Sequence, residues 1–506
     1  MKVVTRLVSV SGSILLFAGW LFGGRQAVAQ GEARQARRAS VSLREVAGRK
    51  DLASRLEGII PWLMSEGEVP GLSMALVRDA KISWHRGFGV KSAETREPVR
   101  DDTVFEAASL SKPVFAYAVL KLVDGGKLEL DKPLAAYLPE PYVRDDERVK
   151  LITARTVLDH TTGFQNEASP GRPLKIYFTP GEKFSYSGEG FLYLQRVVER
   201  ITGEPLEAFM KRTVFEPLGM TSSYYVRPDG DDARKASGHD PSGAVARNSR
   251  PALARSYSGL HTTALDYAKF LIAVMGGTGL RKGTAGQMWK AQVRLDEGCF
   301  SCIERSPGRL SQTLSWGLGW GLERTEAGDA VWHWGDNNSE FQSFVMAYPK
   351  ERVGVVIFTN SGNGLSVTPE IVSQIVGRDH PAFAWMGYEP YNSPARLLFR
   401  DILARGGAAV SQYRESRKSR AVALSEAQVN ALGYRLLGKK RVEEAVEAFK
   451  MNVEDYPNSS NAYDSLGEAY MIKGDKELSV RNYQRSLELN PDNTNAVEML
   501  RRLRGR

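Results

Sequence analysis

Ser109 and Lys112 are the two residues of this chain whose types and spacing best suit covalent chemistry. They stand three positions apart, directly before Pro113 and the apolar run 114–120. That run is typical of a buried helix with proline in its first turn, and residues three apart on a helix share one face. A serine hydroxyl is a weak nucleophile until a base removes its proton, and a partly desolvated lysine can be that base. The spacing predicts a nucleophile and its base, and the alternative is a serine helix cap beside a solvated lysine.

Short motifs lie on both sides of this pair. Val69-Pro70-Gly71 precedes it, and the motifs that follow are LDHTTG at 158–163, PGEKFSYSG at 180–188, WGLGWG at 316–321 and WHWGD at 332–336. In this order they resemble the motifs of the serine β-lactamase and penicillin-binding-protein superfamily, most closely the class C β-lactamase-like serine hydrolases and esterases. The resemblance runs from Val69 to the region of Asn360.

The resemblance implies a role for each catalytic candidate. Ser109 would form an acyl-enzyme that water hydrolyses, and Lys112 would act as its base or as a cation that lowers a neighbouring pKa. Tyr186 matches the family's motif tyrosine, which would share the proton and pass it to the leaving group. The alternative for Tyr186 is a half-buried tyrosine after a turn, but its spacing from Pro180-Gly181 favours the catalytic role.

A second set of candidates would bind the substrate or its oxyanion, namely His333, Gly335, Asp336 and Ser187. His333 and Gly335 take the place of the family's Lys-Thr-Gly strand, where glycine would let the substrate approach closely. By the same resemblance, the backbone N–H groups of Ser109 and Asp336 would form the oxyanion hole. The alternative for His333 is a histidine packed between two tryptophans. His160 matches a family motif in which the histidine is structural.

Gly188 departs from the family pattern. It stands where lactamases and peptidases carry an asparagine whose amide contacts the lysine and the substrate. Histidine in place of lysine at position 333 also weakens the binding of a substrate carboxylate, because histidine is only partly charged at neutral pH. These two differences favour an ester or a peptide over a β-lactam as the substrate.

The order of expected elements predicts an α+β fold. Strands at 73–77 and 81–85 precede a largely helical middle, and further strands follow at 330–333, 341–348 and 353–359. The resemblance adds a β-lactamase-like antiparallel sheet flanked by helices, with a helical subdomain and the active site between them. The predicted divisions are a signal peptide at 1–29, a flexible segment at 30–42, the hydrolase at 43–380, a helical linker at 381–425 and helical repeats at 426–506.

The N-terminus predicts export. Lys2 and Arg6 precede an apolar stretch, and Ala27-Val28-Ala29 provides a cleavage site. We therefore expect a bacterial periplasmic or extracellular protein. In an oxidising compartment Cys299 and Cys302 would suit a local disulfide, although the sequence leaves its formation open. The net charge is +9, and basic residues gather at 34–50, 396–420 and 501–506, which would favour an anionic wall or membrane surface or else form a solvated linker and tail.

A second pattern begins after Arg420. Leu432-Gly433 recurs as Leu466-Gly467, Phe449 as Tyr483 and Pro457 as Pro491, each 34 residues later. This is the period of tetratricopeptide repeats, and 495–504 would form a capping helix. The repeats would bind a peptide or protein partner, or would only stabilise the hydrolase.

The leading interpretation is an exported serine hydrolase acting through an acyl-Ser109 intermediate on a small ester, amide or peptide. It would need no metal and no organic cofactor, and no motif indicates a nucleic acid. The alternatives are a β-lactamase or D,D-peptidase, and a weakly active sensor of wall fragments that recruits a partner through its repeats. The natural substrate, the ligand of the repeats and the oligomeric state are not readable from the sequence.

Overall fold

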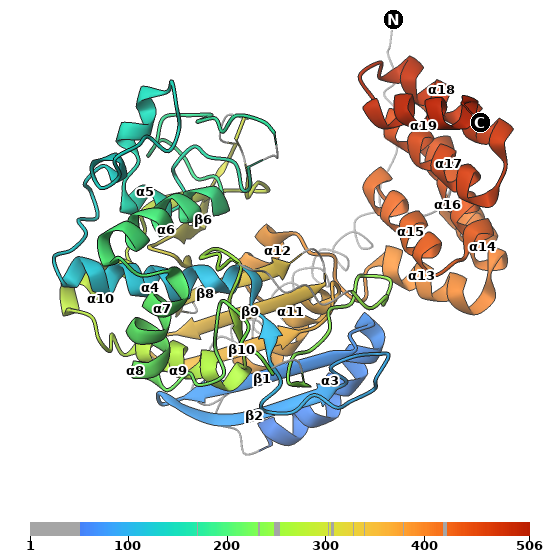
Figure 1. Ribbon diagram of the computed structural model, residues 1–506. Helices are drawn as coiled ribbons and strands as arrows, with labels where there is room; N and C mark the ends of the chain where they lie inside the picture. Colours follow the sequence, from blue (N-terminus) through green and yellow to red (C-terminus); the bar gives the residue numbers. More distant parts are fainter. Residues whose placement is uncertain are drawn as a thin grey trace, which may run out of the picture.

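The computed structural model describes most of the chain after residue 50. The described residues are 51–505 except 169–170, 231–232, 247–252, 302, 305–307, 327, 338–339, 378 and 418–422. The predicted signal peptide and flexible N-terminal segment lie outside this range. Figure 1 shows a central sheet, a group of helices on one side of it and a stack of C-terminal helices on the other.

The central sheet has eight antiparallel strands in the order β2-β1-β10-β9-β8-β7-β6-β5. Their bounds are β1 Gly71–Arg78, β2 Lys81–Gly89, β5 Val293–Asp296, β6 Leu310–Trp316, β7 Gly321–Thr325, β8 Gly328–Asn337, β9 Phe341–Tyr348 and β10 Val353–Thr359. The predicted antiparallel sheet is confirmed, and β9 and β10 have the predicted bounds. Because β1 pairs with β10, the two ends of the domain meet inside one sheet.

The inner strands β1, β9 and β10 are buried on both faces, and they divide their side chains between two cores. In β10, Val356 and Phe358 belong to one hydrophobic cluster, whereas Val355 and Ile357 belong to the other. This alternation follows from the period of two residues in a strand. Helices α3 (Leu52–Gly67) and α11 (Gly364–Val376) cover one face, and α9 (Ala264–Met275) covers the other.

The helical region surrounds α4 (Ser111–Asp124), whose first ten residues are all buried. Strand β3 (Phe105–Glu106) leads into the turn before α4, and it pairs with β4 (His261–Thr262) from later in the chain. The other elements of this region are η1 Ala108–Leu110, η2 Leu134–Ala136, η3 Glu147–Leu151, α5 Ala154–Leu158, α6 Gly188–Thr202, α7 Leu206–Met210, the π-helical turn η4 Lys211–Phe215, α8 Glu216–Leu218 and α10 Lys282–Met288.

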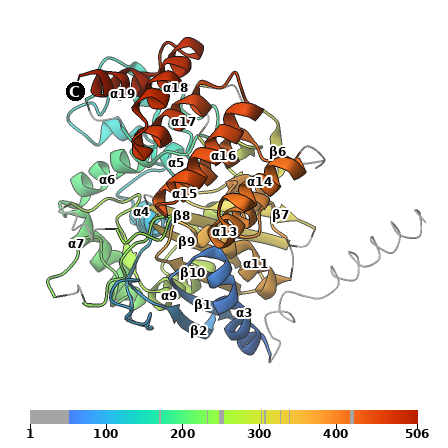
Figure 2. The ribbon, with the colours of Figure 1, turned by 90° about the vertical axis from the view of Figure 1, so that its right-hand side faces the viewer.

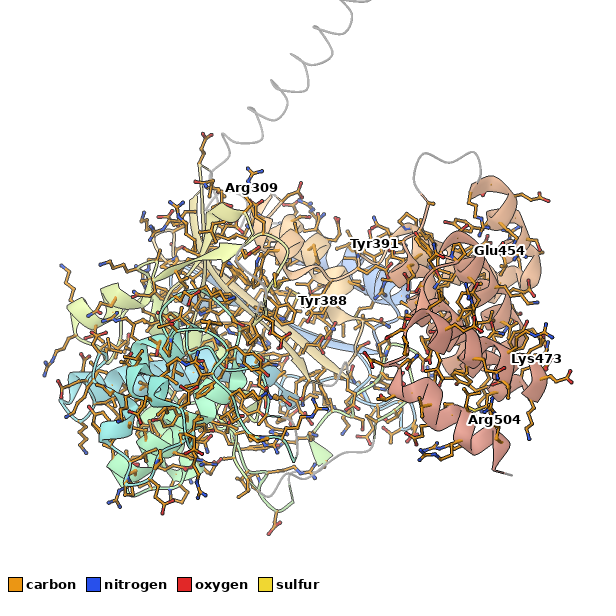
Figure 3. All side chains as sticks on the ribbon, turned by 90° about the horizontal axis from the view of Figure 1, so that it is seen from above. Arg309, Tyr388, Tyr391, Glu454, Lys473 and Arg504 are labelled. Carbon is orange, nitrogen blue, oxygen red and sulfur yellow. The ribbon has the colours of Figure 1, made fainter. Side chains whose placement is uncertain are left out.

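The C-terminal helices form a body of their own. They are α13 Pro394–Arg405, α14 Gly407–Ser416, α15 Glu426–Gly438, α16 Val442–Asp455, α17 Ser460–Lys473, α18 Lys476–Leu489 and α19 Thr494–Arg504. The preceding helix α12 (Pro381–Met386) packs instead into the core of the sheet through Ala382 and Trp385. Figure 1 shows α13–α19 stacked on the side of the sheet away from the helical region around α4, and Figure 2 views the molecule from the side of this stack. Figure 3 places Tyr391 between the sheet and the helices that carry Glu454 and Arg504.

Ion pairs join this body to the corner between α3 and β1. Glu68 directly follows α3. Its carboxylate forms ion pairs with the Arg435 guanidinium at 2.7 Å and with the Lys439 amine at 3.5 Å. Glu66 pairs with Arg400 close by. The pairs are partly exposed, so each contributes little on its own, and their arrangement fixes where the helices attach.

Helices of the C-terminal body recur at the interval that the sequence predicts. α15, α17 and α19 begin at Glu426, Ser460 and Thr494, each 34 residues after the one before. Each of the four helices from α15 packs on the next one along the chain. The helical character of this segment is established, whereas its assignment to the tetratricopeptide class stays a prediction.

Gly433 is expected to be intolerant of a side chain. A Cβ at this position would lie 2.5 Å from Cε1 of the Phe449 ring. We expect Gly433→Ala to lower the free energy of unfolding by about 1–3 kcal/mol through overpacking, despite alanine's higher helix propensity. Chemical denaturation followed by circular dichroism measures this change. Gly58→Ala in α3, where no atom lies within 4 Å, is the control and should stabilise the protein; equal effects of the two substitutions would contradict the packing argument.

Candidate active site

Ser109 lies on a tight turn rather than inside the predicted helix. The turn is η1, and α4 begins two residues later at Ser111. Ala108 has φ +49°, a conformation that residues with a Cβ rarely adopt. Hydrogen bonds hold the turn in place, because Ser111 Oγ donates to Ala108 O at 2.6 Å and Ser343 Oγ donates to Ala107 O at 2.9 Å. The strained turn is therefore fixed from both α4 and β9.

Lys112 contacts Ser109 as the spacing predicts. Its Nζ donates to Ser109 Oγ at 3.0 Å and to the backbone carbonyl of Tyr257 at 3.0 Å. The side chain is 1% exposed, and this burial lowers the pKa of Lys112 well below its usual value, while the charge of Glu167 opposes the decrease. Burial therefore favours the neutral amine, which can accept a proton from the serine hydroxyl.

Aromatic rings surround the Lys112 amine. Nζ lies 4.6 Å from the ring centroid of Tyr186, 5.4 Å from that of Tyr257 and 5.7 Å from that of Phe191. Such rings exclude water from the amine. The attraction between a ring face and an ammonium ion is weaker than the hydration that the ammonium ion would have in water. The cage therefore fixes the amine and keeps it dry.

Tyr186 is buried against the same amine, and its ring stacks on His160 with centroids 4.3 Å apart. Burial raises the pKa of Tyr186, and an interaction with Ser109 opposes the increase. Within the described residues the Tyr186 hydroxyl has no partner that meets the distance and angle limits of a hydrogen bond, so this hydroxyl is available to a reacting group. A phenol with a raised pKa keeps its proton at neutral pH, which suits a proton donor rather than a base.

His333 is fully buried in β8. Nδ1 lies 2.7 Å from the carbonyl oxygen of Trp334, so it carries the hydrogen, and Nε2 has no hydrogen-bond partner in the described part of the chain. Burial and the charge of Lys112 lower the pKa of His333 to about 3. The ring packs between Trp316 and Tyr186, with centroids 5.4 and 6.1 Å away. His333 is therefore packed against Trp316, Tyr186 and Trp334, rather than between Trp332 and Trp334 as the alternative had it, and it supplies no positive charge for a substrate carboxylate.

Gly335 and Asp336 lie where β8 meets the serine turn. A Cβ at Gly335 would stand 2.5 Å from Ala107 O and 3.0 Å from Ala108 Cβ. The glycine thus lets β8 approach the turn itself, which is a different reason from the substrate approach expected from the sequence. Oδ2 of Asp336 accepts from Gln342 Nε2 at 2.9 Å and from the Tyr388 hydroxyl at 3.0 Å. A carboxylate only accepts hydrogen bonds, so the group of Asp336 that could hold an oxyanion is its backbone N–H.

The prediction that Ser187 contacts the substrate is not supported by its side chain. Ser187 Oγ caps α6 by accepting from Gly190 N at 3.1 Å, and it donates its hydrogen to Gln165 O at 2.8 Å. The residue is 1% exposed. Because the hydroxyl hydrogen is used and the residue is buried, Ser187 belongs to the framework that holds Tyr186.

Two residues near the site have no motif that could have revealed them. Tyr257 lies 145 positions beyond Lys112 yet accepts its hydrogen bond, and its ring stands beside Gly188. Phe300 accepts the backbone N–H of Tyr186 at 2.8 Å, and its ring lies 6.3 Å from that of Tyr186 while remaining 46% exposed. The neighbouring Cys299 is disulfide-bonded, and Cys302, its predicted partner, lies outside the described residues.

Within the residues that the structure describes, no helix is long and apolar enough to cross a membrane. The same residues contain no cluster of three or more side chains suited to hold a metal ion.

Comparison with known proteins assigns a family to most of the chain. A model of the β-lactamase family matches residues 56–371. Penicillin-binding protein 4 of Amycolatopsis lactamdurans is 26% identical over 348 residues, which cover 62% of this chain and 87% of that protein. Esterase EstB of Burkholderia gladioli is 32% identical over 205 residues, covering 35% of this chain and 52% of that protein.

The fold has solved counterparts. The structure of D-alanine carboxypeptidase AmpC from Burkholderia cenocepacia superimposes with a TM-score of 0.55 at 22% identity. The superposition covers 65% of this chain and 99% of that protein, and it shows a common fold.

Proposed function

Because this chain belongs to the β-lactamase family of serine hydrolases, we propose that it is an exported hydrolase that cleaves a small ester through an acyl-Ser109 intermediate. The observation that carries the proposal is the 3.0 Å contact between the buried Lys112 amine and Ser109 Oγ. Amides and peptides are the next substrate class, because the same acyl transfer would cleave them.

The proposed reaction uses the three catalytic side chains in turn. The neutral Lys112 amine takes the proton of Ser109, and Oγ attacks the substrate carbonyl. The backbone N–H groups of Ser109 and Asp336 hold the oxyanion, and Tyr186 gives its proton to the departing alcohol and recovers one from Lys112. Water then attacks the acyl group and gives its proton to Lys112. Ser109 Oγ leaves with a proton through the same side chains, so the acid is released and Ser109 is restored.

Two features favour esters over β-lactams and D-alanyl peptides. His333 is neutral and buried, so no cation stands on β8 for a substrate carboxylate. Gly188 brings no amide to the site, and Tyr257 and Asn166 fill the adjoining space, since a Cβ would lie 2.9 Å from each. A chromogenic comparison tests the preference. We expect turnover of p-nitrophenyl butyrate and slow or no turnover of a cephalosporin and of a D-alanyl-D-alanine peptide, whereas faster turnover of either of the last two would replace the ester assignment.

The hydrolysis rate is expected to rise with pH through the pKa of Lys112. Only the neutral amine accepts the serine proton, and burial places this rise at a lower pH than a solvated lysine would give. His333, whose pKa is lowered to about 3, is neutral above pH 3, so its titration adds no step to the rate–pH profile near pH 7. We therefore expect His333→Gln to leave the midpoint of the kcat/KM–pH profile in place, even if kcat falls. Loss of a step near neutral pH in this variant would assign the titration to His333 instead.

A second proposed activity is partner binding by the C-terminal helices. It rests on a hollow of about 620 Å³ lined by residues of α15 and its neighbours, which include Asn430, Tyr434, Tyr456 and Asn461. We propose that a peptide or protein partner binds there, and that the exported protein associates with an anionic wall or membrane surface through its basic segments. Peptide-array binding by the full chain and by an Asn430→Ala/Tyr434→Ala variant tests the hollow, and equal binding by both would exclude it.

A further inference from the structure

Tyr257 is held rigidly next to the catalytic lysine. The preceding residue, Ser256, donates its N–H to Gln195 Oε1 at 2.9 Å and its hydroxyl to Phe191 O at 3.0 Å, so α6 fixes this stretch of backbone. The carbonyl of Tyr257 then accepts Lys112 Nζ at 3.0 Å. The two partners of the amine, Ser109 Oγ and this carbonyl, determine where the amine points.

The Tyr257 ring occupies the space that Gly188 leaves open. A Cβ on Gly188 would lie 2.9 Å from Cδ2 of the ring. The same ring has its centroid 5.4 Å from Lys112 Nζ and is 5% exposed. Its hydroxyl accepts from Arg255 Nη1 at 3.3 Å. The ring therefore closes one side of the lysine, and Gly188 is the residue that makes room for it.

We propose that Tyr257 is a positioning residue for Lys112, in which the ring excludes water from the amine and the carbonyl aims it at Ser109. This inference rests on the proposed function, because it assumes that Lys112 is the base for Ser109. It also assigns Gly188 a purpose, which is to admit the ring of a residue distant in sequence.

The charged and titratable groups around the amine come from several elements. Glu167 raises the pKa of Lys112, the buried His160 and His333 lie within electrostatic reach of it, and the Tyr186 ring lies against it. Arg255 donates to the Tyr257 hydroxyl. Removal of the ring at 257 leaves these groups in place and admits water to Nζ. Hydration stabilises the ammonium form, so the pKa of Lys112 should rise.

The pH dependence of Ser109 labelling by a fluorophosphonate tests this role without knowledge of the natural substrate. In Tyr257→Ala we expect the midpoint of the labelling-rate profile to move up by about one pH unit, with a roughly tenfold slower rate at neutral pH that recovers at high pH. Tyr257→Phe keeps the ring and the carbonyl, and it should keep the wild-type midpoint. Tyr257→Leu is the second variant should the alanine protein fail to fold, and its smaller side chain should move the midpoint in the same direction.

The outcomes separate this inference from the proposed function. A wild-type protein whose Ser109 cannot be labelled would overturn both. Normal wild-type labelling with the same or a lower midpoint in Tyr257→Ala and Tyr257→Leu would overturn the role of Tyr257 alone. A shifted midpoint in Tyr257→Phe would transfer the effect from the ring to the hydroxyl and its contact with Arg255, which also overturns the inference as stated.

Discussion

Ser109→Ala is expected to lower kcat/KM for p-nitrophenyl butyrate by about 10⁴-fold or more, because nucleophile removal in hydrolases of this kind abolishes the covalent route. The wild-type protein and the variant would be compared at equal concentration in a continuous absorbance assay. Mass spectrometry of the protein after rapid quenching should show the added acyl group in the wild type and none in the variant.

A matched control is available one residue from Tyr186. Ser185 is buried, and its hydroxyl has no hydrogen-bond partner within the described residues. Ser185→Ala removes the same atom from the same region and should retain activity within a few-fold. If Ser109→Ala and wild type hydrolyse the ester equally, the nucleophile is another residue. If both are inactive toward esters, the ester proposal fails and partner binding by the C-terminal helices becomes the leading function.

Gly335→Ala is expected to cause the second-largest loss, about 10²-fold or more in kcat/KM, because small displacements of catalytic groups have effects of this size. The added Cβ would stand 2.5 Å from Ala107 O, so either β8 or the serine turn must shift. The turn is already strained at Ala108 and carries Ser109, so a shift there moves the nucleophile away from Lys112.

The control for this substitution is Gly286→Ala in α10, where no atom lies within 4 Å of the added carbon. It should leave kcat/KM unchanged. Thermal unfolding of both variants separates displacement from unfolding, since Gly335→Ala should lose activity at temperatures where it remains folded. Retention of full activity by folded Gly335→Ala would show that the turn tolerates the carbon and that β8 does not determine its position.

The sequence predicted the parts of this molecule that local patterns determine. Short apolar runs located β9 and β10, which are buried along their whole length, and the apolar run after Pro113 located α4. Motif resemblance identified the contact between Ser109 and Lys112, because their spacing is set within one turn of chain. The 34-residue interval located the helices after Ser425 for the same reason, since each repeat is a local unit.

Residues whose neighbours are distant in the chain could not be predicted in this way. The conformation of Ala108 depends on contacts with α4 and β9, and no local pattern requires a positive φ at an alanine. The side chain of Ser187 gives the predicted substrate contact no support, because its hydroxyl caps α6, and the motif did not reveal this cap. The position of Tyr257 beside the site could not be predicted, because its partners, Lys112 and Gly188, come from two other segments of the chain.

The pairing of β1 with β10 has a consequence for how the protein reaches its active form. Leu72 pairs with Thr359, so the first strand of the domain stays without its inner neighbour until the last strand has been made. Contacts of such long sequence separation form slowly, because a large loop must close before they contribute. The Ser109 turn also needs Ser343 from β9, so the proposed nucleophile reaches its position only when the whole domain closes. A chain that is still unfinished therefore carries no working serine.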